Sequence, residues 1–185
     1  FPKVNFIRYA DDFIVTGESR ELLEAGVLPI IREFLSERGL ELSEEKTVIT
    51  HIEDGFDFLG CNIRWYKDRL LTKPSKKNYK AIVNKIRGII KQNPSMKQED
   101  LIRKLNPVIR GWVNFQKNNV SSQAFDRFDF DVWRCLWRWC KRRHPKKSHK
   151  WIAKKYFRRV GTRNWTFSVN MADSFELHLI YATDT

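Results

Sequence analysis

Apolar and polar residues in the first part of the chain alternate in a way that predicts short strands around one amphipathic helix. Strand-like apolar residues flank two adjacent acids within residues 4–15, which predicts a hairpin with the acids at its tip. Residues 19–38 keep a helical period, with Ser19 as the N-cap and Gly39 as the stop. Pro29 should kink or divide this helix, because proline lacks an N–H donor and crowds the preceding turn.

The pattern continues with strands and then becomes helical. We expect strands at residues 47–52 and 56–65, separated by an acidic turn, and a short strand at residues 70–72 that pairs with the second. From Pro74 onward apolar residues recur at helical spacing, so we expect a domain boundary at residues 73–75.

Helices dominate the rest of the chain. The first should begin at Ser75. Ser95 and Gln98 have the capping-box spacing and should open a second helix that ends before Pro107, and Gly111 marks a bend or a close approach. The remaining expected elements are helices over residues 123–143 and 148–157 and a small hairpin formed by residues 165–169 and 175–181. The predicted fold class is α+β, with domains at residues 1–73 and 74–160 and a tail at 161–185.

The composition is that of an ordered protein. Hydrophobic residues make up 42% of the 185 residues and aromatic residues 14%, which excludes the disordered and collagen-like classes. We expect no membrane span and no secretory signal, because the apolar runs are too short. The three cysteines are scattered, which favours a reducing compartment: the cytoplasm of a bacterium, or an organelle of a eukaryote. Because the chain opens on Phe1 inside a strand-like run, we interpret it as a fragment.

Charge is distributed unevenly along the chain. Residues 1–60 hold 6 Lys/Arg and 13 Asp/Glu, a net charge of −7, whereas the following 125 residues hold 29 and 9, a net charge of +20. All seven tryptophans lie in the basic part. Such a field attracts a polyanion and releases counterions on contact, so we expect RNA or DNA as the partner. The alternatives are a basic surface kept for solubility or contact with an anionic membrane, and no isolated amphipathic basic helix supports the membrane version.

Asp11 and Asp12 indicate metal chemistry. Two adjacent carboxylates repel one another unless a cation neutralises them. Mg²⁺ prefers carboxylate oxygens, water and phosphates, and a pair of such ions stabilises the attacking and leaving oxygens of a phosphoryl transfer. A site of this kind needs at least one further carboxylate, and none of the later acids in residues 1–60 stands out as that ligand.

Six short motifs carry a resemblance that covers nearly the whole chain. Three lie in the acidic part: Phe-Ile-Arg-Tyr-Ala-Asp-Asp-Phe-Ile-Val (6–15), Leu-Glu-Leu-Ser-Glu-Glu-Lys-Thr (40–47) and Gly-Phe-Asp-Phe-Leu-Gly (55–60). Three lie in the basic part: Asn-Pro-Val-Ile-Arg-Gly-Trp (106–112), Leu-Trp-Arg-Trp (136–139) and Arg-Arg-His-Pro-Lys-Lys-Ser (142–148). The first resembles the Tyr-x-Asp-Asp hairpin of reverse transcriptases. In this order, the set resembles the later polymerase motifs and the maturase (X, or thumb) domain of group II intron-encoded reverse transcriptases.

The resemblance implies the C-terminal part of a polymerase palm, then a helical thumb or maturase domain, then a tail. It implies that Asp11 is the main metal ligand and Asp12 its less direct neighbour, with Mg²⁺ as the cofactor and Mn²⁺ as a substitute. Ala10 would keep the hairpin slim, and Tyr9 would lie against the nucleotide or the primer end. The family's first catalytic Asp and its fingers residues have no counterpart here, so we expect that the chain alone does not extend a primer.

Two later segments receive roles from the same resemblance. Lys46 occupies the position where polymerases place a cation near the leaving pyrophosphate, and general-acid work there is chemically reasonable. The alternative is a solvated lysine at the start of a strand. Phe58, Leu59 and Gly60 would sit in the hairpin that steadies the primer, although Phe58 and Leu59 are also compatible with a plain core position.

The basic part offers a candidate RNA surface. On the helix predicted at residues 123–143, charged positions four residues apart form one stripe and apolar positions another, so one face packs and one binds. The predicted RNA-binding residues are Arg134, Arg138, Lys141, Arg142, Arg143, Lys146, Lys147 and Lys150. Their last cluster also resembles a nuclear-localisation signal. We expect Trp112, Trp133 and Trp137 in the core. The Cys and His residues of this region lack the spacing of a zinc module.

The implied function is RNA-directed DNA synthesis by two-metal phosphoryl transfer, combined with binding of intron RNA to assist splicing. The implied partners are group II intron RNA, an RNA template with a DNA primer, a DNA target and dNTPs. One alternative is a non-catalytic RNA-binding splicing factor, against which the intact Asp11-Asp12 pair argues. The other is a different template-copying polymerase, retron-type or RNA-dependent RNA polymerase, for which Ala10 and the maturase-like half are unfavourable.

Overall fold

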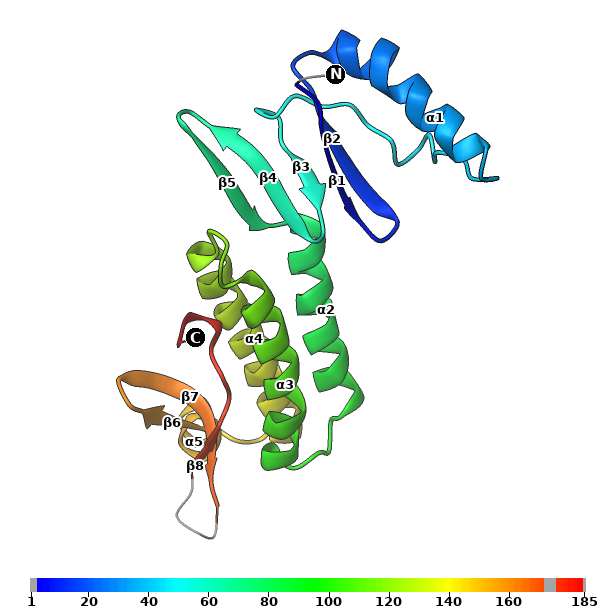
Figure 1. Ribbon diagram of the computed structural model, residues 1–185. Helices are drawn as coiled ribbons and strands as arrows, with labels where there is room; N and C mark the ends of the chain where they lie inside the picture. Colours follow the sequence, from blue (N-terminus) through cyan, green and yellow to red (C-terminus); the bar gives the residue numbers. More distant parts are fainter. Residues whose placement is uncertain (1–2, 172–175, 185) are drawn as a thin grey trace. The chain divides into compact units, whose positions relative to one another are not determined.

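The computed structural model describes residues 3–171 and 176–184 and divides into two compact units, Phe1–Asp54 and Gly55–Thr185 (Figure 1). Helices and antiparallel strands occur together, which confirms the α+β class. The strands expected at residues 56–72 group with the helices in this division. The domain boundary at residues 73–75 stays a prediction.

The first unit contains a two-stranded hairpin and a divided helix. β1 (Asn5–Tyr9) pairs antiparallel with β2 (Asp12–Thr16), as the alternating pattern predicted. The Ser19 hydroxyl accepts a hydrogen bond from the Leu22 amide at 3.2 Å, as expected of an N-cap. The helix then continues as a π-helical segment, η1 (Leu22–Val27), followed by α1 (Leu28–Ser36).

Pro29 divides this helix, as predicted. It lies in the first turn of α1, directly after the π-helical segment, and has no N–H with which to continue the helical hydrogen bonds. Its ring crowds the preceding turn, and the wider π-helical spacing of η1 relieves that crowding. At the other end Gly39 adopts a φ of +67°, and the Leu40 amide donates to the Leu35 carbonyl at 3.0 Å, which closes the helix.

The strand predicted over residues 47–52 is wrong, since turns and irregular backbone occupy this stretch. Thr47 donates both its amide and its hydroxyl to the Ser43 carbonyl, at 2.9 and 2.8 Å. Such local bonds compete with strand pairing. Val48 is 74% exposed, so burial adds nothing in favour of a strand here.

A three-stranded antiparallel sheet opens the second unit. It consists of β3 (Phe56–Phe58), β4 (Cys61–Tyr66) and β5 (Arg69–Pro74), in that order. The prediction of one strand over residues 56–65 is wrong, because the chain reverses at Leu59 and Gly60. Their φ angles of +49° and +78° form a two-residue hairpin turn. The short strand expected at residues 70–72 is confirmed as part of β5.

Four helices follow and build the centre of this unit (Figure 1). They are α2 (Lys76–Gln92), α3 (Gln98–Gln116), α4 (Ser122–Arg143) and α5 (His149–Tyr156). Two of the N-caps are serines, as expected: Ser75 Oγ accepts from the Asn78 amide at 3.1 Å and Ser148 Oγ from the Trp151 amide at 3.3 Å. The extents of α2, α4 and α5 agree with the sequence periodicity.

The end predicted for the second helix is wrong, because α3 continues through Pro107 and Gly111. A proline inside a helix costs about 3 kcal/mol. The apolar stripe of α3 outweighs that cost, since Leu105 and Ile109 on either side of the proline are completely buried. Gln98 serves no capping box; its side-chain amide donates instead to the carbonyls of Tyr156 and Ser168, at 2.9 and 3.0 Å.

A second three-stranded sheet packs on the helices. Its strands are β6 (Phe157–Val160), β7 (Arg163–Asn170) and β8 (Glu176–His178), and a 3₁₀ turn, η2 (Ala182–Asp184), follows. β7 and β8 occupy the place of the predicted tail hairpin, whose second strand would begin at Phe175, outside the described residues. β6 was not predicted, because its apolar residues also fit the end of α5.

One core joins the four helices and this sheet. Phe128, Leu136 and Phe167 are completely buried in it. Trp112 is buried, as predicted, whereas Trp133 and Trp137 are only partly buried against the core. No helix in the described ranges combines the length and the apolar character that crossing a bilayer requires.

Candidate functional site

The two adjacent aspartates lie at the tip of the β1–β2 hairpin. Tyr9 and Asp12 form the last residue pair, and Ala10 and Asp11 make the two-residue turn between them. Ala10 adopts a φ of +50°, a left-handed conformation that costs about 1–2 kcal/mol for a residue with a side chain. The Arg8 Nε donates to the Ala10 carbonyl at 2.8 Å. The tip is therefore a slim turn with a strained backbone.

Both faces of the hairpin are accessible in the first unit. Paired residues share a face, so Tyr9 and Asp12 lie on one side, and Phe6 and Phe13 stack on the other with ring centroids 5.5 Å apart. Tyr9 is 64% exposed. Asp11 and Asp12 are also exposed, and neither side chain makes a hydrogen bond or an ion pair with any residue that the structure describes. Their oxygens are therefore available to a cation.

These carboxylates fit part of a magnesium site. Mg²⁺ prefers hard oxygen ligands and retains several waters, and two exposed carboxylates match that donor set. Within residues 3–171 and 176–184, no three His, Cys, Asp or Glu side chains come together in a metal-binding group. A complete site consequently needs further oxygens, from water, phosphate or another carboxylate.

The other predicted catalytic and primer-binding residues lie in turns or at the end of a strand. Lys46 is exposed in a turn and donates its amide to the Ser43 carbonyl at 3.0 Å, so it does not start a strand. Phe58 and Gly60 belong to the β3–β4 hairpin of the second unit, and Leu59 at its tip is 37% exposed. Among the predicted catalytic and primer-binding residues, the structure brings these together in one turn: Tyr9, Ala10, Asp11 and Asp12.

A polar network anchors the β3–β4 turn to the helices. The Gly60 carbonyl accepts a hydrogen bond from the Ser75 amide at 3.0 Å. Asn78 lies directly beneath Gly60, and its Oδ1 accepts from Trp112 Nε1 at 2.7 Å and from Gln116 Nε2 at 3.3 Å. These bonds explain why the first sheet of the second unit groups with the helices.

Most of the predicted RNA-binding residues have side chains open to solvent. Arg138, Lys141 and Arg142 are exposed on α4 and make no side-chain hydrogen bond or ion pair within the described part of the chain. Lys146 and Lys150 are exposed in the same way around the start of α5. All of these cations can therefore meet phosphates without first leaving another partner.

Two of the predicted residues already have partners. Arg143 donates from one guanidinium nitrogen to the carbonyls of Pro94 and Met96, at 2.8 and 2.9 Å, and lies over the Trp139 ring at 4.4 Å. Arg134 forms an ion pair with Asp131 at 3.3 Å. Arg143 thus ties the loop after α2 to α4, in addition to any contact that it makes with a ligand.

The C-terminal ends of α2 and α4 meet at a basic cavity of about 370 Å³. We call this surface the basic end; it comprises Lys91, Arg142, Arg143, His144, Lys147 and Lys155. Helix C-termini carry partial negative charge, which favours cations in their last turns. Lys91 and Lys155 were not predicted. The short connections of an up-and-down bundle bring alternate helix ends together, and that is the signal that could have identified Lys91.

His144 lies in the middle of the basic end. Its Nε2 is 2.7 Å from the Tyr156 hydroxyl, and its ring meets Trp151 edge-on at 4.7 Å. Burial, together with the neighbouring charges of Lys155, Arg143 and Lys147, lowers the pKa of His144 below its usual range. The imidazole is therefore neutral at pH 7.

Comparison with known proteins accounts for both units. Residues 79–157 match the family "Group II intron, maturase-specific domain", and residues 1–63 match "Reverse transcriptase (RNA-dependent DNA polymerase)". Together these matches support a group II intron-encoded reverse transcriptase and maturase. This confirms the resemblance that the motifs carry. Members of the reverse transcriptase family use divalent metal ions and act on nucleic acids.

Curated relatives match about half of the chain. It is similar to the "Group II intron-encoded protein LtrA" of Lactococcus lactis subsp. cremoris and to the protein of the same name from strain MG1363. Each is 27% identical over 96 residues, which make up 51% of this chain and 16% of the relative. The matched stretch is thus a small part of each relative's length.

Proposed function

We propose that this chain contributes two parts of a group II intron reverse transcriptase: carboxylates of the DNA-synthesis centre and a surface that binds intron RNA to assist splicing. The observation that carries the proposal is an Asp-Asp pair with free oxygens on a slim hairpin, followed in the same chain by the basic end. The proposed substrates are an RNA template with a DNA primer, a DNA target and dNTPs.

Asp11 and Asp12 would hold Mg²⁺, or Mn²⁺ in its place. The bound ions would supply Lewis-acid stabilisation to the attacking and leaving oxygens of the phosphoryl transfer. Tyr9, on the same face as Asp12, would pack against the nucleotide or the primer end, and the slim Ala10 would let the primer approach. We expect no primer extension by residues 1–185 alone, because two carboxylates leave the metal site incomplete.

We propose supporting roles for the remaining motif residues, which are Lys46, Phe58, Leu59 and Gly60. Lys46 is exposed, and its ammonium would neutralise charge near the leaving pyrophosphate. The tight β3–β4 turn with the exposed Leu59 would support the primer strand. Both roles come from the motifs. Primer-extension kinetics of variants at these positions would test them.

The basic end and the exposed stripe of α4 would bind phosphates of the intron RNA. Arg138 and Arg142 lie four residues apart and therefore on one face of α4. Neither makes an ion pair within the described residues, so each phosphate contact would release a counterion and add to the salt dependence of binding. Arg143 would hold the surface together through Pro94 and Met96.

The experiment measures the dissociation constant of the purified chain for structured intron RNA at several KCl concentrations. We expect salt-sensitive binding by the unaltered chain. The double variant Arg138→Gln/Arg142→Gln should bind more weakly and lower the slope of log affinity against log salt by about 1.5, because two phosphate contacts are lost.

The matched control is Lys104→Gln/Arg110→Gln, which removes the same charge from exposed positions on α3. This control should keep the slope of the unaltered chain. Equal effects of the two double variants would mean that net charge alone drives binding, and insensitivity to KCl would remove the electrostatic basis of the proposal.

A further inference from the structure

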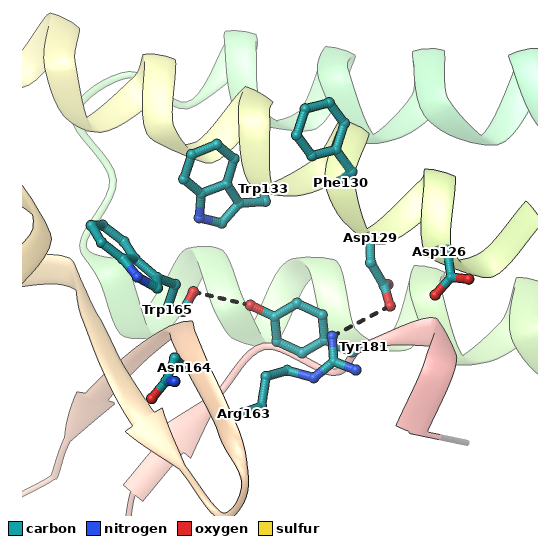
Figure 2. Close-up of a pocket in the computed structure, with 8 residues that line it drawn as sticks. All are labelled: Asp126, Asp129, Phe130, Trp133, Arg163, Asn164, Trp165 and Tyr181. Atoms are coloured by element: carbon teal, nitrogen blue, oxygen red, sulfur yellow. Dashed lines mark hydrogen bonds and ion pairs between the residues drawn. The ribbon is translucent and has the colours of Figure 1, made fainter. Parts of the chain in front are cut away.

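A second cavity, of about 220 Å³, lies between α4 and the C-terminal segment (Figure 2). Its lining includes the aromatic residues Phe130 and Trp133 from α4, Trp165 from β7 and Tyr181 from the stretch before η2. Asp126 of α4 also lines it. The basic end shares none of these residues, so the two cavities are distinct.

The walls are flat aromatic surfaces that face solvent in part. Phe130 is 57% exposed and Trp165 51% exposed. Phe130, Trp133 and Trp137 follow one another on successive turns of α4 in stacked pairs, with centroids 6.3 and 5.6 Å apart. Trp165 meets Trp137 edge-on at 6.0 Å. Aromatic rings open to water in this way provide stacking platforms for unpaired bases.

The backbone at Trp165 is strained. Its φ of +61° is left-handed, and it lies where the β6–β7 register shifts between Arg158 and Val160, so that β7 bulges. Bulges redirect side chains, and strained non-glycine residues concentrate at functional sites. The strain therefore indicates that the position of this exposed ring has a use besides packing.

Hydrogen bonds and a cation–π contact fasten the floor of the cavity. Asp129 accepts hydrogen bonds from the amides of Ala182 and Thr183, at 2.7 and 3.2 Å. Arg163 lies over the Tyr181 ring at 4.2 Å and donates to Asp184 at 2.8 Å. The groups that fasten the C-terminal segment to α4 are therefore already bonded to one another.

Two polar groups at the cavity remain without partners in the described residues. The indole nitrogen of Trp133 is buried and makes no hydrogen bond. Figure 2 shows it on the side of the ring that faces Trp165 and Tyr181. The Asp126 carboxylate is exposed at the cavity and makes neither a hydrogen bond nor an ion pair. The Asp126 carboxylate is thus an accessible acceptor at the cavity, whereas the indole nitrogen lies within its wall.

We propose that this cavity holds a single unpaired guanine of the RNA that the unit binds; the assignment rests on the proposed RNA-binding function. Guanine presents two neighbouring N–H donors on its Watson–Crick edge, which suit the exposed Asp126 carboxylate, and a flat ring that suits the aromatic walls. Adenine instead turns an unprotonated ring nitrogen toward the carboxylate. The charge of +20 carried by the residues after Gly60 favours a polyanion over a cationic occupant of the aromatic cavity.

The test compares three RNA hairpins that differ in one position: a fully paired stem, the same stem with an unpaired G, and the same stem with an unpaired A. Binding to the chain is measured by fluorescence anisotropy at constant salt. We expect the unpaired G to strengthen binding about tenfold over the paired stem, as one stacked and hydrogen-bonded base allows. The unpaired A should gain much less.

Variants locate the effect. Trp165→Ala should abolish the advantage of the unpaired G while keeping the affinity for the paired stem and its salt slope. Asp126→Asn should remove most of the preference for G over A. Trp65→Ala, which removes another exposed tryptophan of the same unit, should change neither. An advantage of G that survives Trp165→Ala would overturn the assignment.

The outcomes separate this proposal from the function on which it rests. Salt-sensitive binding that is equal for all three hairpins contradicts the guanine site alone, whereas a failure to bind any of them contradicts the RNA-binding function as well. Release of the guanine-containing hairpin by tetramethylammonium chloride, beyond the effect of equal KCl, would assign the cavity to a cation and overturn the proposal.

Discussion

Gly60 offers a quantitative test of how the β3–β4 turn is attached to the helices. A Cβ at this position would lie 2.7 Å from Asn78 Nδ2 and 3.3 Å from Asn78 Cγ. Gly60→Ala therefore requires Asn78 to move, and Asn78 is the acceptor for Trp112 Nε1. The left-handed backbone costs an alanine about 1–2 kcal/mol. A disturbed buried hydrogen bond adds about 1–3 kcal/mol, so the expected total loss of stability is about 2–5 kcal/mol.

Two other glycines of the same unit separate these contributions. Gly161 has a φ of +57° and nothing within 4 Å of an added Cβ, so Gly161→Ala should show the backbone cost alone, about 1–2 kcal/mol. Gly111 lies inside α3 with equally open space. Gly111→Ala should stabilise the unit by about 0.5–1 kcal/mol, because alanine is the better helix former.

The assay is equilibrium unfolding in urea, followed by tryptophan fluorescence. All seven tryptophans lie in the second unit, so the signal reports that unit. The extra cost of Gly60→Ala over Gly161→Ala should largely disappear in an Asn78→Ala background, as expected of a pairwise contact. Equal losses in the free energy of unfolding for Gly60→Ala and Gly161→Ala would contradict this prediction, since the contact with Asn78 would then contribute nothing to stability.

The remaining predictions concern pH. Because the pKa of His144 is lowered in the folded chain, the unfolded chain takes up the proton first as pH falls through about 6.5, so the stability of the second unit should fall with pH there. His144→Asn should flatten this dependence in urea titrations. RNA phosphates favour the charged imidazole, so RNA binding should strengthen between pH 7.5 and about 5.5 and take up a proton, measurable by calorimetry in two buffers. Pronounced pH dependence that persists in His144→Asn would contradict this assignment.

The elements that the sequence predicted are those with local causes. α2, α4 and α5 have an unbroken helical period, and serines cap two of them, so both their type and their ends follow from neighbouring residues. The turn of the first hairpin was predictable in the same way, because two acids interrupt apolar strands on both sides. Local chemistry decides each of these features.

The elements that the sequence missed are decided by contacts between distant residues. α3 passes through Pro107 because its stripe packs against the other helices, a gain that the local rule for proline leaves out. β6 forms because β7 offers it an edge, although its residues also fit a helix. The opposite error occurs at residues 47–52. Their side chains favour a strand, but the segment adopts turns and irregular backbone because Thr47 donates to the Ser43 carbonyl.

The candidate sites divide in the same way. The Asp11-Asp12 pair is a motif of adjacent residues and was visible in the sequence. The bonding of Arg143 to Pro94, the approach of Lys91 to α4 and the cavity beside Trp165 join residues far apart in the chain. A basic, aromatic composition predicted that such surfaces exist, and only the packing of the helices decides which side chains form them.

The most direct test is Mg²⁺-dependent primer extension by a complete reverse transcriptase polypeptide that includes residues 1–185, compared with its Asp11→Asn variant. Binding of intron RNA is measured on the same preparations. Asp11→Asn should abolish extension while RNA binding stays unchanged, because in the proposed function the carboxylate would hold the metal and the basic end would hold the RNA. Extension at the unaltered rate by Asp11→Asn would contradict it.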